Sequence, residues 1–249
     1  MQLFSPFCPS CRENLARNGD SFTCSKCGRV YPLKNGVVDF LTSLPLSDVQ
    51  QVAQTTFNAI APSYDNAIVR LVESLGCPWS TYTAKLEAFM TQAGGKVILD
   101  VGCGTAFPVG SFVPQTSIYL GADISAEMLG HAKILLGDNL NSALWNIDVE
   151  RIPLPDTCVD ICLALMAFNV FPNPHKAATE IHRVLKKDGS FFGTVFVQPP
   201  PEEILSERPL EPALVREVLA VFDPALWELS IETQGGVLFF HVRKSASKG

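Results

Sequence analysis

Long apolar runs are absent from this chain of 249 residues. No stretch approaches the roughly 20 apolar residues that cross a bilayer, so the sequence predicts no transmembrane segment. The chain begins MQLFSPFCPSC, which has neither the basic region nor the apolar core of a secretory signal, and we expect no leader. Charged residues are also few, at 18% against 47% hydrophobic residues, so the composition favours a packed core over disorder.

Positive charge is scarce. The net charge is −6: residues 1–45 hold five Lys/Arg against three Asp/Glu, a net +2, while the rest holds 14 against 22, a net −8. A protein that binds nucleic acid through a broad surface needs a basic face to neutralise phosphates. The charge balance therefore argues against such a surface, and a small basic pole at one end changes this little.

Eight cysteines are few for a disulfide scaffold in a chain of this length, and their spacing favours metal binding in a reducing, cytoplasmic compartment. Two C-x2-C pairs are separated by twelve residues, enough for a hairpin with its turn at residues 18–20. Two redox-active pairs or free thiols are the alternative, but neither pair opens a helix in a βαβ pattern. Four thiolates around Zn2+ leave no open position, so the sequence predicts a structural zinc site at Cys8, Cys11, Cys24 and Cys27.

The segment after the second cysteine pair, GRVYPLKNGVVDFL, is typical of two short strands joined by residues 34–36. Residues 7–42 carry a YP-x-x-x-G-x-x-x-x-L pattern and resemble the small zinc-ribbon family whose members are activating subunits of tRNA and protein methyltransferases. The resemblance implies a protein partner bound through the ribbon. Residues 42–50 are predicted to form a linker, and we divide the chain into a zinc ribbon at 1–45 and a larger domain at 46–249.

Beyond the linker, apolar strands alternate with amphipathic helices. Strands are predicted at residues 96–101, 118–122, 142–147, 159–165 and 190–197, and helices around residues 63–75, 80–90, 125–136, 174–186 and 211–222. Two further strands flank Gly235 and Gly236 and form a hairpin. This order predicts an α/β fold with a seven-stranded, mainly parallel sheet that is wound on both faces and ends in an antiparallel hairpin.

Three acids fall at the carboxyl ends of the first three strands of this sheet, where open α/β sheets bind their ligands. Asp100 precedes a glycine loop that contains Gly102 and Gly104; it would repel a pyrophosphate but suits the sulfonium and ammonium of S-adenosylmethionine. Asp123 lies 21 residues after Gly102, the distance at which an acid can accept both ribose hydroxyls. Asp148 could accept from the adenine amine. The sequence therefore predicts S-adenosylmethionine as the cofactor.

Five motifs match a known family in order and spacing: FNAIAPSYDN, LDVGCGT, GADISAEML, DVERIPLPDTCVD and EIHRVLKKDGSF. They span residues 55–197, which resemble class I S-adenosylmethionine-dependent methyltransferases, closest to the group that contains the ubiquinone and menaquinone C-methyltransferases. The resemblance implies a Rossmann-like sheet and a methyltransferase activity. It also implies a set of cofactor contacts, namely Tyr64 on a lid helix, Asp100, Gly102, Gly104, Asp123, Met128 and Asp148.

The segment ALMAFNVFPNPH departs from the family pattern, because many relatives place a His-His or similar pair there. The resemblance therefore transfers neither a substrate nor a catalytic base. We expect a small hydrophobic acceptor, quinone-, polyketide- or lipid-like. Methylation of an rRNA or tRNA base with the ribbon as the RNA-binding part is the alternative, and a non-catalytic partner-binding protein is a second one. Candidate acceptor contacts are Phe168, Asn169, Phe171 and His175.

Overall fold

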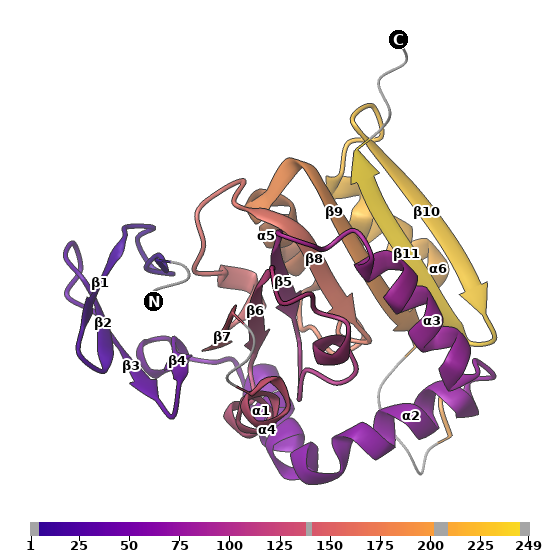
Figure 1. Cartoon of the computed structure of the whole chain (residues 1–249), viewed down its shortest axis with the longest axis horizontal. Coiled ribbons are helices and arrows are strands. Elements are labelled where there is room, and N and C mark those ends of the chain that lie inside the picture. Colours follow the sequence, from indigo (N-terminus) through magenta and orange to yellow (C-terminus); the bar gives the residue numbers. More distant parts are fainter. Residues whose placement is uncertain (1–4, 138–140, 202–208, 245–249) are drawn as a thin grey trace.

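A single mixed sheet organises the protein in the computed structural model, which describes residues 5–137, 141–201 and 209–244. Its main part has the order β7-β6-β5-β8-β9-β11-β10, and the first five of these strands are parallel. Strand β11 lies antiparallel between β9 and β10, as the predicted hairpin requires (Figure 1). The α/β prediction is confirmed. The strands are β5 (Val97–Val101), β6 (Ile118–Asp123), β7 (Asn141–Asn146), β8 (Val159–Leu165), β9 (Leu185–Phe196), β10 (Trp227–Gln234) and β11 (Val237–Lys244).

Helices cover both faces of the sheet. Side chains of α2, α3 and α4 pack into one buried cluster, and those of α5 and α6 pack into a second cluster on the opposite face (Figure 1). Local signals start these helices: Ser125 accepts a hydrogen bond from the Met128 N–H at the start of α4, and Asn173 with Pro174 starts α5. The helices are α1 (Asp48–Ile60), α2 (Tyr64–Ser74), α3 (Trp79–Met90), α4 (Ala126–Leu136), α5 (Pro174–Val184) and α6 (Pro212–Val218).

The structure corrects three details of the sequence prediction. The predicted linker at residues 42–50 ends early, because Ser47 and Gln50 form a capping box that starts α1 at Asp48. The predicted helix at 174–186 ends at Val184, where Leu185 turns to an extended conformation and begins β9. The predicted helix at 211–222 is α-helical only over Pro212–Val218 and ends in the 3-10 helix Leu219–Val221.

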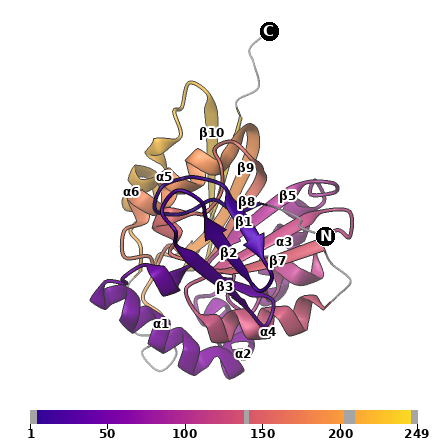
Figure 2. The same cartoon turned by 90° about the vertical axis from the view of Figure 1, so that its left-hand side faces the viewer.

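The N-terminal ribbon is built from β1 (Leu15–Asn18), β2 (Ser21–Cys24), β3 (Val30–Lys34) and β4 (Val37–Asp39). Strand β4 pairs in parallel with β7, so the ribbon continues the central sheet beyond its β7 edge (Figure 2). The aromatic ring of Phe40 lies 5.1 Å from that of Tyr31 and 5.8 Å from that of Trp145, measured between centroids. The ribbon and the larger domain thus share backbone pairing and one apolar cluster, and the boundary at residue 45 stays a prediction.

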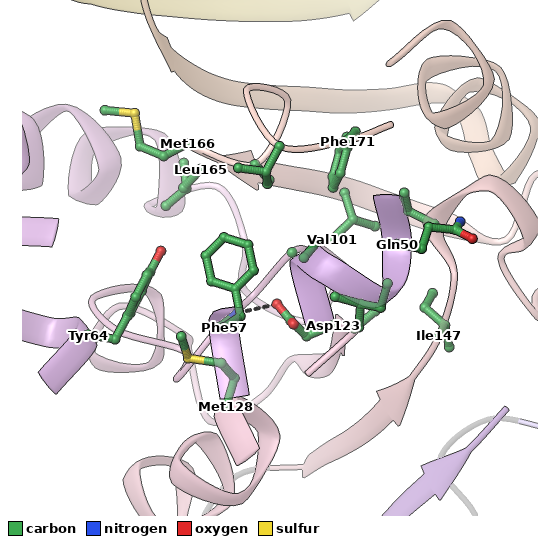
Figure 3. A pocket seen from close by; sticks show the side chains of 18 of the residues that line it. Gln50, Phe57, Tyr64, Val101, Asp123, Met128, Ile147, Leu165, Met166 and Phe171 are labelled. Carbon is green, nitrogen blue, oxygen red and sulfur yellow. Dashed lines mark hydrogen bonds between the residues drawn. The ribbon is translucent and has the colours of Figure 1, made fainter. Parts of the chain in front are cut away.

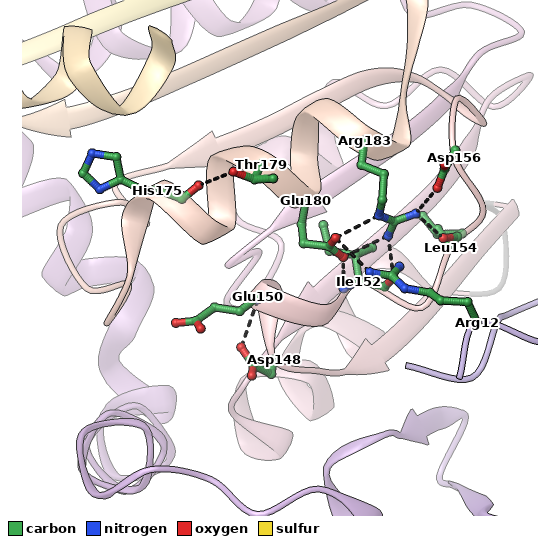
Figure 4. A network of polar contacts seen from close by, with 10 residues as sticks. All are labelled: Arg12, Asp148, Glu150, Ile152, Leu154, Asp156, His175, Thr179, Glu180 and Arg183. Carbon is green, nitrogen blue, oxygen red and sulfur yellow. Dashed lines mark hydrogen bonds and ion pairs between the residues drawn. The ribbon is translucent and has the colours of Figure 1, made fainter. Parts of the chain in front are cut away.

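An ion network around the buried carboxylate of Glu180 makes a second attachment of the ribbon (Figure 4). Arg12 donates to the backbone oxygen of Ile152 at 3.2 Å and to Glu180 at 2.9 Å, and Arg183 donates to the same carboxylate at 2.8 Å. Burial acts to raise the pKa of Glu180, but the hydrogen bonds from Arg183 and Arg12 outweigh it and hold that pKa below its ordinary value. The network fixes α5 and the segment after β7 to the ribbon.

In the part of the chain that the structure describes, no helix is long and apolar enough to cross a bilayer.

Candidate functional site

A cavity of about 930 Å3, counted with its open mouth, lies at the carboxyl ends of β5, β6, β7 and β8. Helices α1 and α2 contribute side chains to its other wall (Figure 3). The position is the one where open α/β sheets bind their ligands.

The glycine loop after β5 forms one side of the cavity. Gly102 and Gly104 both have positive φ values, +69° and +53°. A Cβ at Gly102 would lie 2.6 Å from the Cβ of Ala167, and a Cβ at Gly104 would lie 3.2 Å from the Tyr64 ring. A larger residue at either position would crowd these neighbours and strain the backbone, so the loop conformation requires glycine at both positions.

Asp123 ends β6 and points into the middle of the cavity (Figure 3). Its two carboxylate oxygens accept hydrogen bonds from the backbone N–H groups of Gly104, at 2.9 Å, and Ser125, at 2.8 Å. Burial raises the pKa of this carboxyl above its ordinary value. Each oxygen has a second lone-pair direction, so the group is oriented by the loop and can still accept from a ligand.

Asp148 follows β7 and lines the cavity beside Ile147 and Val149. One of its oxygens accepts from the Glu150 N–H at 2.9 Å, which leaves the other for a ligand donor. Two apolar side chains next to a carboxylate suit a flat aromatic ring that carries an amine. The sequence analysis missed Gln50, which lies at the same end of the cavity as Ile147 (Figure 3), because its segment was taken as a linker.

Asp100 lies behind the glycine loop and does not line the main cavity. Its side chain is buried, and one oxygen accepts from the Tyr119 hydroxyl at 2.8 Å. Burial raises the pKa of Asp100 to about 7. The carboxyl lines a smaller adjoining cavity that shares Gly102 and Tyr64 with the main one.

The two residues that only the family resemblance supplied also line the cavity. Met128 is buried in the first turn of α4, and Tyr64 begins α2 with its ring against Gly104. Figure 3 shows Tyr64 at the end of the cavity opposite Ile147, with Asp123 between them.

The structure brings only one of the four acceptor candidates to the cavity, Phe171. Phe168 is buried in an aromatic cluster, with its ring centroid 6.0 Å from that of Phe191. The Asn169 side chain donates to and accepts from the backbone of Phe196. His175 is exposed at the start of α5, 3.3 Å from Glu217 (Figure 4). Val170 and Phe196, apolar residues expected from the sequence at the mouth, also line the cavity. The rest of the apolar wall comes from residues that sequence reasoning did not select: Phe57, Ile68, Leu71, Leu165, Met166 and Pro172.

The four ribbon cysteines converge as predicted. Their Sγ atoms all lie within 4.8 Å of one another, and the pairs Cys8–Cys27 and Cys11–Cys24 are 3.7 Å and 3.4 Å apart. A tetrahedral zinc site with Zn–S distances of about 2.3 Å places sulfur atoms about 3.8 Å apart. The arrangement therefore fits Zn2+.

Comparison with known sequences links the cavity to a class of enzymes. Residues 99–193 match the family model of the methyltransferase domain. The chain is 28% identical over 241 residues to an uncharacterized chloroplastic methyltransferase of Arabidopsis thaliana, covering 86% of this chain and 68% of that protein. It is 28% identical to a ubiquinone/menaquinone biosynthesis C-methyltransferase of Geobacter sp. strain M21, covering 62% and 67%. It also matches a malonyl-[acyl-carrier protein] O-methyltransferase of Pectobacterium atrosepticum at 30% identity, but spans only 40% of that protein's length.

Solved structures support the fold. The DhpI–SAH complex is similar with a TM-score of 0.60 and 17% identity, covering 79% of this chain and 97% of that one. One chain of the complex between the Haloferax volcanii Trm112 methyltransferase activator and a methyltransferase is similar with a TM-score of 0.57 and 19% identity, covering 76% and 98%. A [4+2]-cyclase, SpnF, shares the fold with a TM-score of 0.59 and 18% identity, so the fold alone does not establish the reaction.

The methyltransferase-domain match, the named relatives and the sheet order together define the class: the protein is an S-adenosylmethionine-dependent methyltransferase. In this chain a four-cysteine ribbon extends the methyltransferase sheet at its β7 edge.

Proposed function

We propose that the enzyme transfers a methyl group from S-adenosylmethionine to a small hydrophobic acceptor, quinone-, polyketide- or lipid-like. The cofactor's ribose hydroxyls are held by Asp123, and its adenine amine by Asp148. Its methionine end lies along Gly102 and Gly104, with Asp100 facing the ammonium through the adjoining cavity. In support of this arrangement, Asp123, Asp148, Gly102 and Gly104 line one cavity, and Asp100 lines the adjoining one.

The proposal of a hydrophobic acceptor rests on the composition of the part of the cavity wall that is not assigned to the cofactor. Apart from the residues assigned to the cofactor, the cavity is lined mainly by aromatic and aliphatic side chains, and none of the described residues that line it is Lys, Arg or His. An apolar wall stabilises an apolar molecule by removing its surface from water. An RNA substrate would require cationic contacts to its phosphates at the same mouth.

The chemistry makes modest demands on the protein. Methyl transfer is an in-line displacement at a sulfonium, which is already a good leaving group, so orientation and exclusion of water supply much of the rate. Among the described residues of the main cavity, the ionisable side chains are Asp123, Asp148 and Tyr64. The two acids are assigned to the cofactor. The cavity therefore suits an acceptor that ionises readily, such as a phenol, a thiol or an enol-type carbon.

We infer that the ribbon binds one structural Zn2+ and acts within its own chain. The Haloferax volcanii complex contains an activator and a methyltransferase, whereas here β4 pairs directly with β7 of the same chain. Cytoplasmic location stays a prediction, and the Arabidopsis thaliana relative is named as chloroplastic.

The test offers the enzyme methyl-labelled cofactor with a lipid and metabolite extract and, separately, with total cellular RNA. Label should appear in the organic-soluble fraction. Phe171→Asn and Leu165→Asn place a polar amide in the apolar wall and should reduce this labelling at least about tenfold, since each removes apolar surface from the wall that would contact the acceptor. Leu226→Asn, at a leucine that is 61% exposed, is the matched control and should have no effect.

Calorimetry with S-adenosylhomocysteine separates the acceptor wall from the cofactor site, because both wall variants should still bind this ligand. Label that enters RNA, at a rate that falls steeply with added salt, would contradict the proposal and favour the RNA-modifying alternative.

A further inference from the structure

Gln50 is held in a fixed orientation at the start of α1. Its side-chain oxygen accepts hydrogen bonds from the Ser47 backbone N–H at 2.9 Å and from the Ser47 hydroxyl at 3.2 Å. A backbone N–H can only donate, so the amide oxygen must face Ser47 and the amide nitrogen must face the other way. The capping box thus decides which end of the amide is free.

The free end of this amide belongs to the cofactor cavity. Gln50 is 7% exposed and lines the cavity, at the same end as Ile147 (Figure 3). Within the residues that the structure describes, none accepts a hydrogen bond from the Gln50 side-chain nitrogen. The Gln50 amide nitrogen is accessible at the cavity, so it is available to donate to an acceptor on a ligand.

The same end of the cavity holds a complementary acceptor. The second oxygen of Asp148 is open to a ligand donor, and Ile147 and Val149 supply apolar surface beside it. The site therefore offers one donor, one acceptor and flat apolar contact. The Watson–Crick edge of adenine presents the matching pattern, with an amine donor beside the ring acceptor N1.

We propose that Gln50 is a specificity-determining residue that donates to adenine N1 while Asp148 accepts from the adenine amine. This inference rests on the proposed function, because it assumes the cofactor in this cavity. A hypoxanthine ring has a carbonyl oxygen and an N1–H on this edge, so it meets Asp148 acceptor to acceptor and Gln50 donor to donor. Gln50 and Asp148 together therefore favour binding of adenine over binding of a hypoxanthine ring. It also gives α1, which directly follows the ribbon segment, a role in cofactor recognition.

The test measures the affinities of two ligands, S-adenosylhomocysteine and S-inosylhomocysteine, by calorimetry. Gln50→Glu keeps an oxygen for the Ser47 N–H but removes the donor, and Gln50→Met removes the donor without adding charge. Both variants should bind the adenosyl ligand about tenfold more weakly, with a much smaller loss for the inosyl ligand. Gln51→Glu is the matched control: Gln51 is exposed on the same helix turn and should change neither affinity.

A variant that weakens both ligands equally, as a purely structural role in capping α1 would, overturns the inference. So does a variant that weakens neither. In both cases the wild-type protein still binds S-adenosylhomocysteine, and the proposed function stands. A wild-type protein that binds neither ligand would overturn the proposed function and this inference together.

Discussion

Asp100 is the residue whose protonation the fold controls most directly. It is buried against Tyr119, and burial raises its pKa to about 7, so the free protein keeps a proton on it through mildly acid conditions. The ordinary value for an aspartate is about 3.9. A positive ammonium in the adjoining cavity would favour the charged carboxylate. Cofactor binding should therefore release this proton.

The first prediction is that affinity for S-adenosylhomocysteine rises with pH. Between about pH 5 and pH 7 the release of the Asp100 proton should contribute up to about tenfold per pH unit, and the rise should then level off. Asp100→Asn keeps an acceptor for the Tyr119 hydroxyl and should flatten this dependence. Asp123, whose pKa burial also raises, contributes to the wild-type slope, so the comparison between wild type and variant isolates Asp100.

Thermal unfolding of the free protein gives an independent check with the opposite sign. A folded pKa above the unfolded one contributes stability below about pH 4 that is lost as pH rises through about 7. Asp100→Asn should therefore gain stability relative to wild type between pH 5 and pH 8. An unchanged slope of affinity with pH in this variant would show that Asp100 does not take part.

Cavity residues at the ends of strands could be predicted from the sequence, whereas those of the opposite cavity wall could not. Alternation of strands and helices places Asp123 and Asp148 at one edge of a parallel sheet, whatever the details of packing. Gln50 and Phe57 reach the same cavity only because α1 packs across that edge. Phe168 shows the reverse error: an aromatic residue after β8 was expected at the cavity and packs into the core.

At the scale of elements, the ribbon is held in place by strand pairing and by ions. Strand β4 adds to the edge of β7, and Arg12 joins the carboxylate network of α5. The four strands of the ribbon are short, three to five residues each, so the ribbon has little apolar mass of its own. Metal closure is the natural source of its stability, since domains of this size usually need one.

The second prediction is that the purified protein contains about one zinc per chain, measured by elemental analysis. Cys24→Ser should lose the metal and make residues before α1 sensitive to protease, because one of the four thiolates is missing. Cys158→Ser is the matched control, since that thiol lies outside the ribbon and should leave both zinc and protease resistance unchanged. A metal-free ribbon that still resists protease would refute the zinc assignment.

The types of the elements could be predicted where the apolar periodicity was strong. The predicted bounds were wrong where the neighbouring structure sets the end of an element. The strand β8 and the final hairpin follow directly from apolar patterns and Gly235. The end of α5, by contrast, is set by its junction with β9. The pairing of β4 with β7 joins residues more than 100 positions apart, and no short sequence pattern encodes that contact.

At the scale of the whole molecule, the added ribbon and hairpin lie at the side edges of the sheet, away from the strand ends where the cavity lies. The ribbon extends one side edge of the sheet, and the hairpin β10–β11 forms the other (Figure 1). The cavity opens at the carboxyl ends of the strands between them. The central claim is that this cavity binds S-adenosylmethionine with Asp123 on the ribose. The proposed acceptor class, the recognition of adenine by Gln50 and Asp148, and the release of a proton from Asp100 all depend on this claim.

Calorimetric titration of S-adenosylhomocysteine into the wild-type protein and into Asp123→Ala tests that claim most directly. The wild type should bind one ligand per chain. The variant should bind at least about tenfold more weakly, because it loses two charge-assisted hydrogen bonds worth about 1.5–3 kcal/mol each. Asp188→Ala, at an exposed aspartate outside the cavity, should bind as the wild type does. Unchanged affinity in an Asp123→Ala protein that unfolds at the wild-type temperature would contradict the assignment of this cavity to the cofactor.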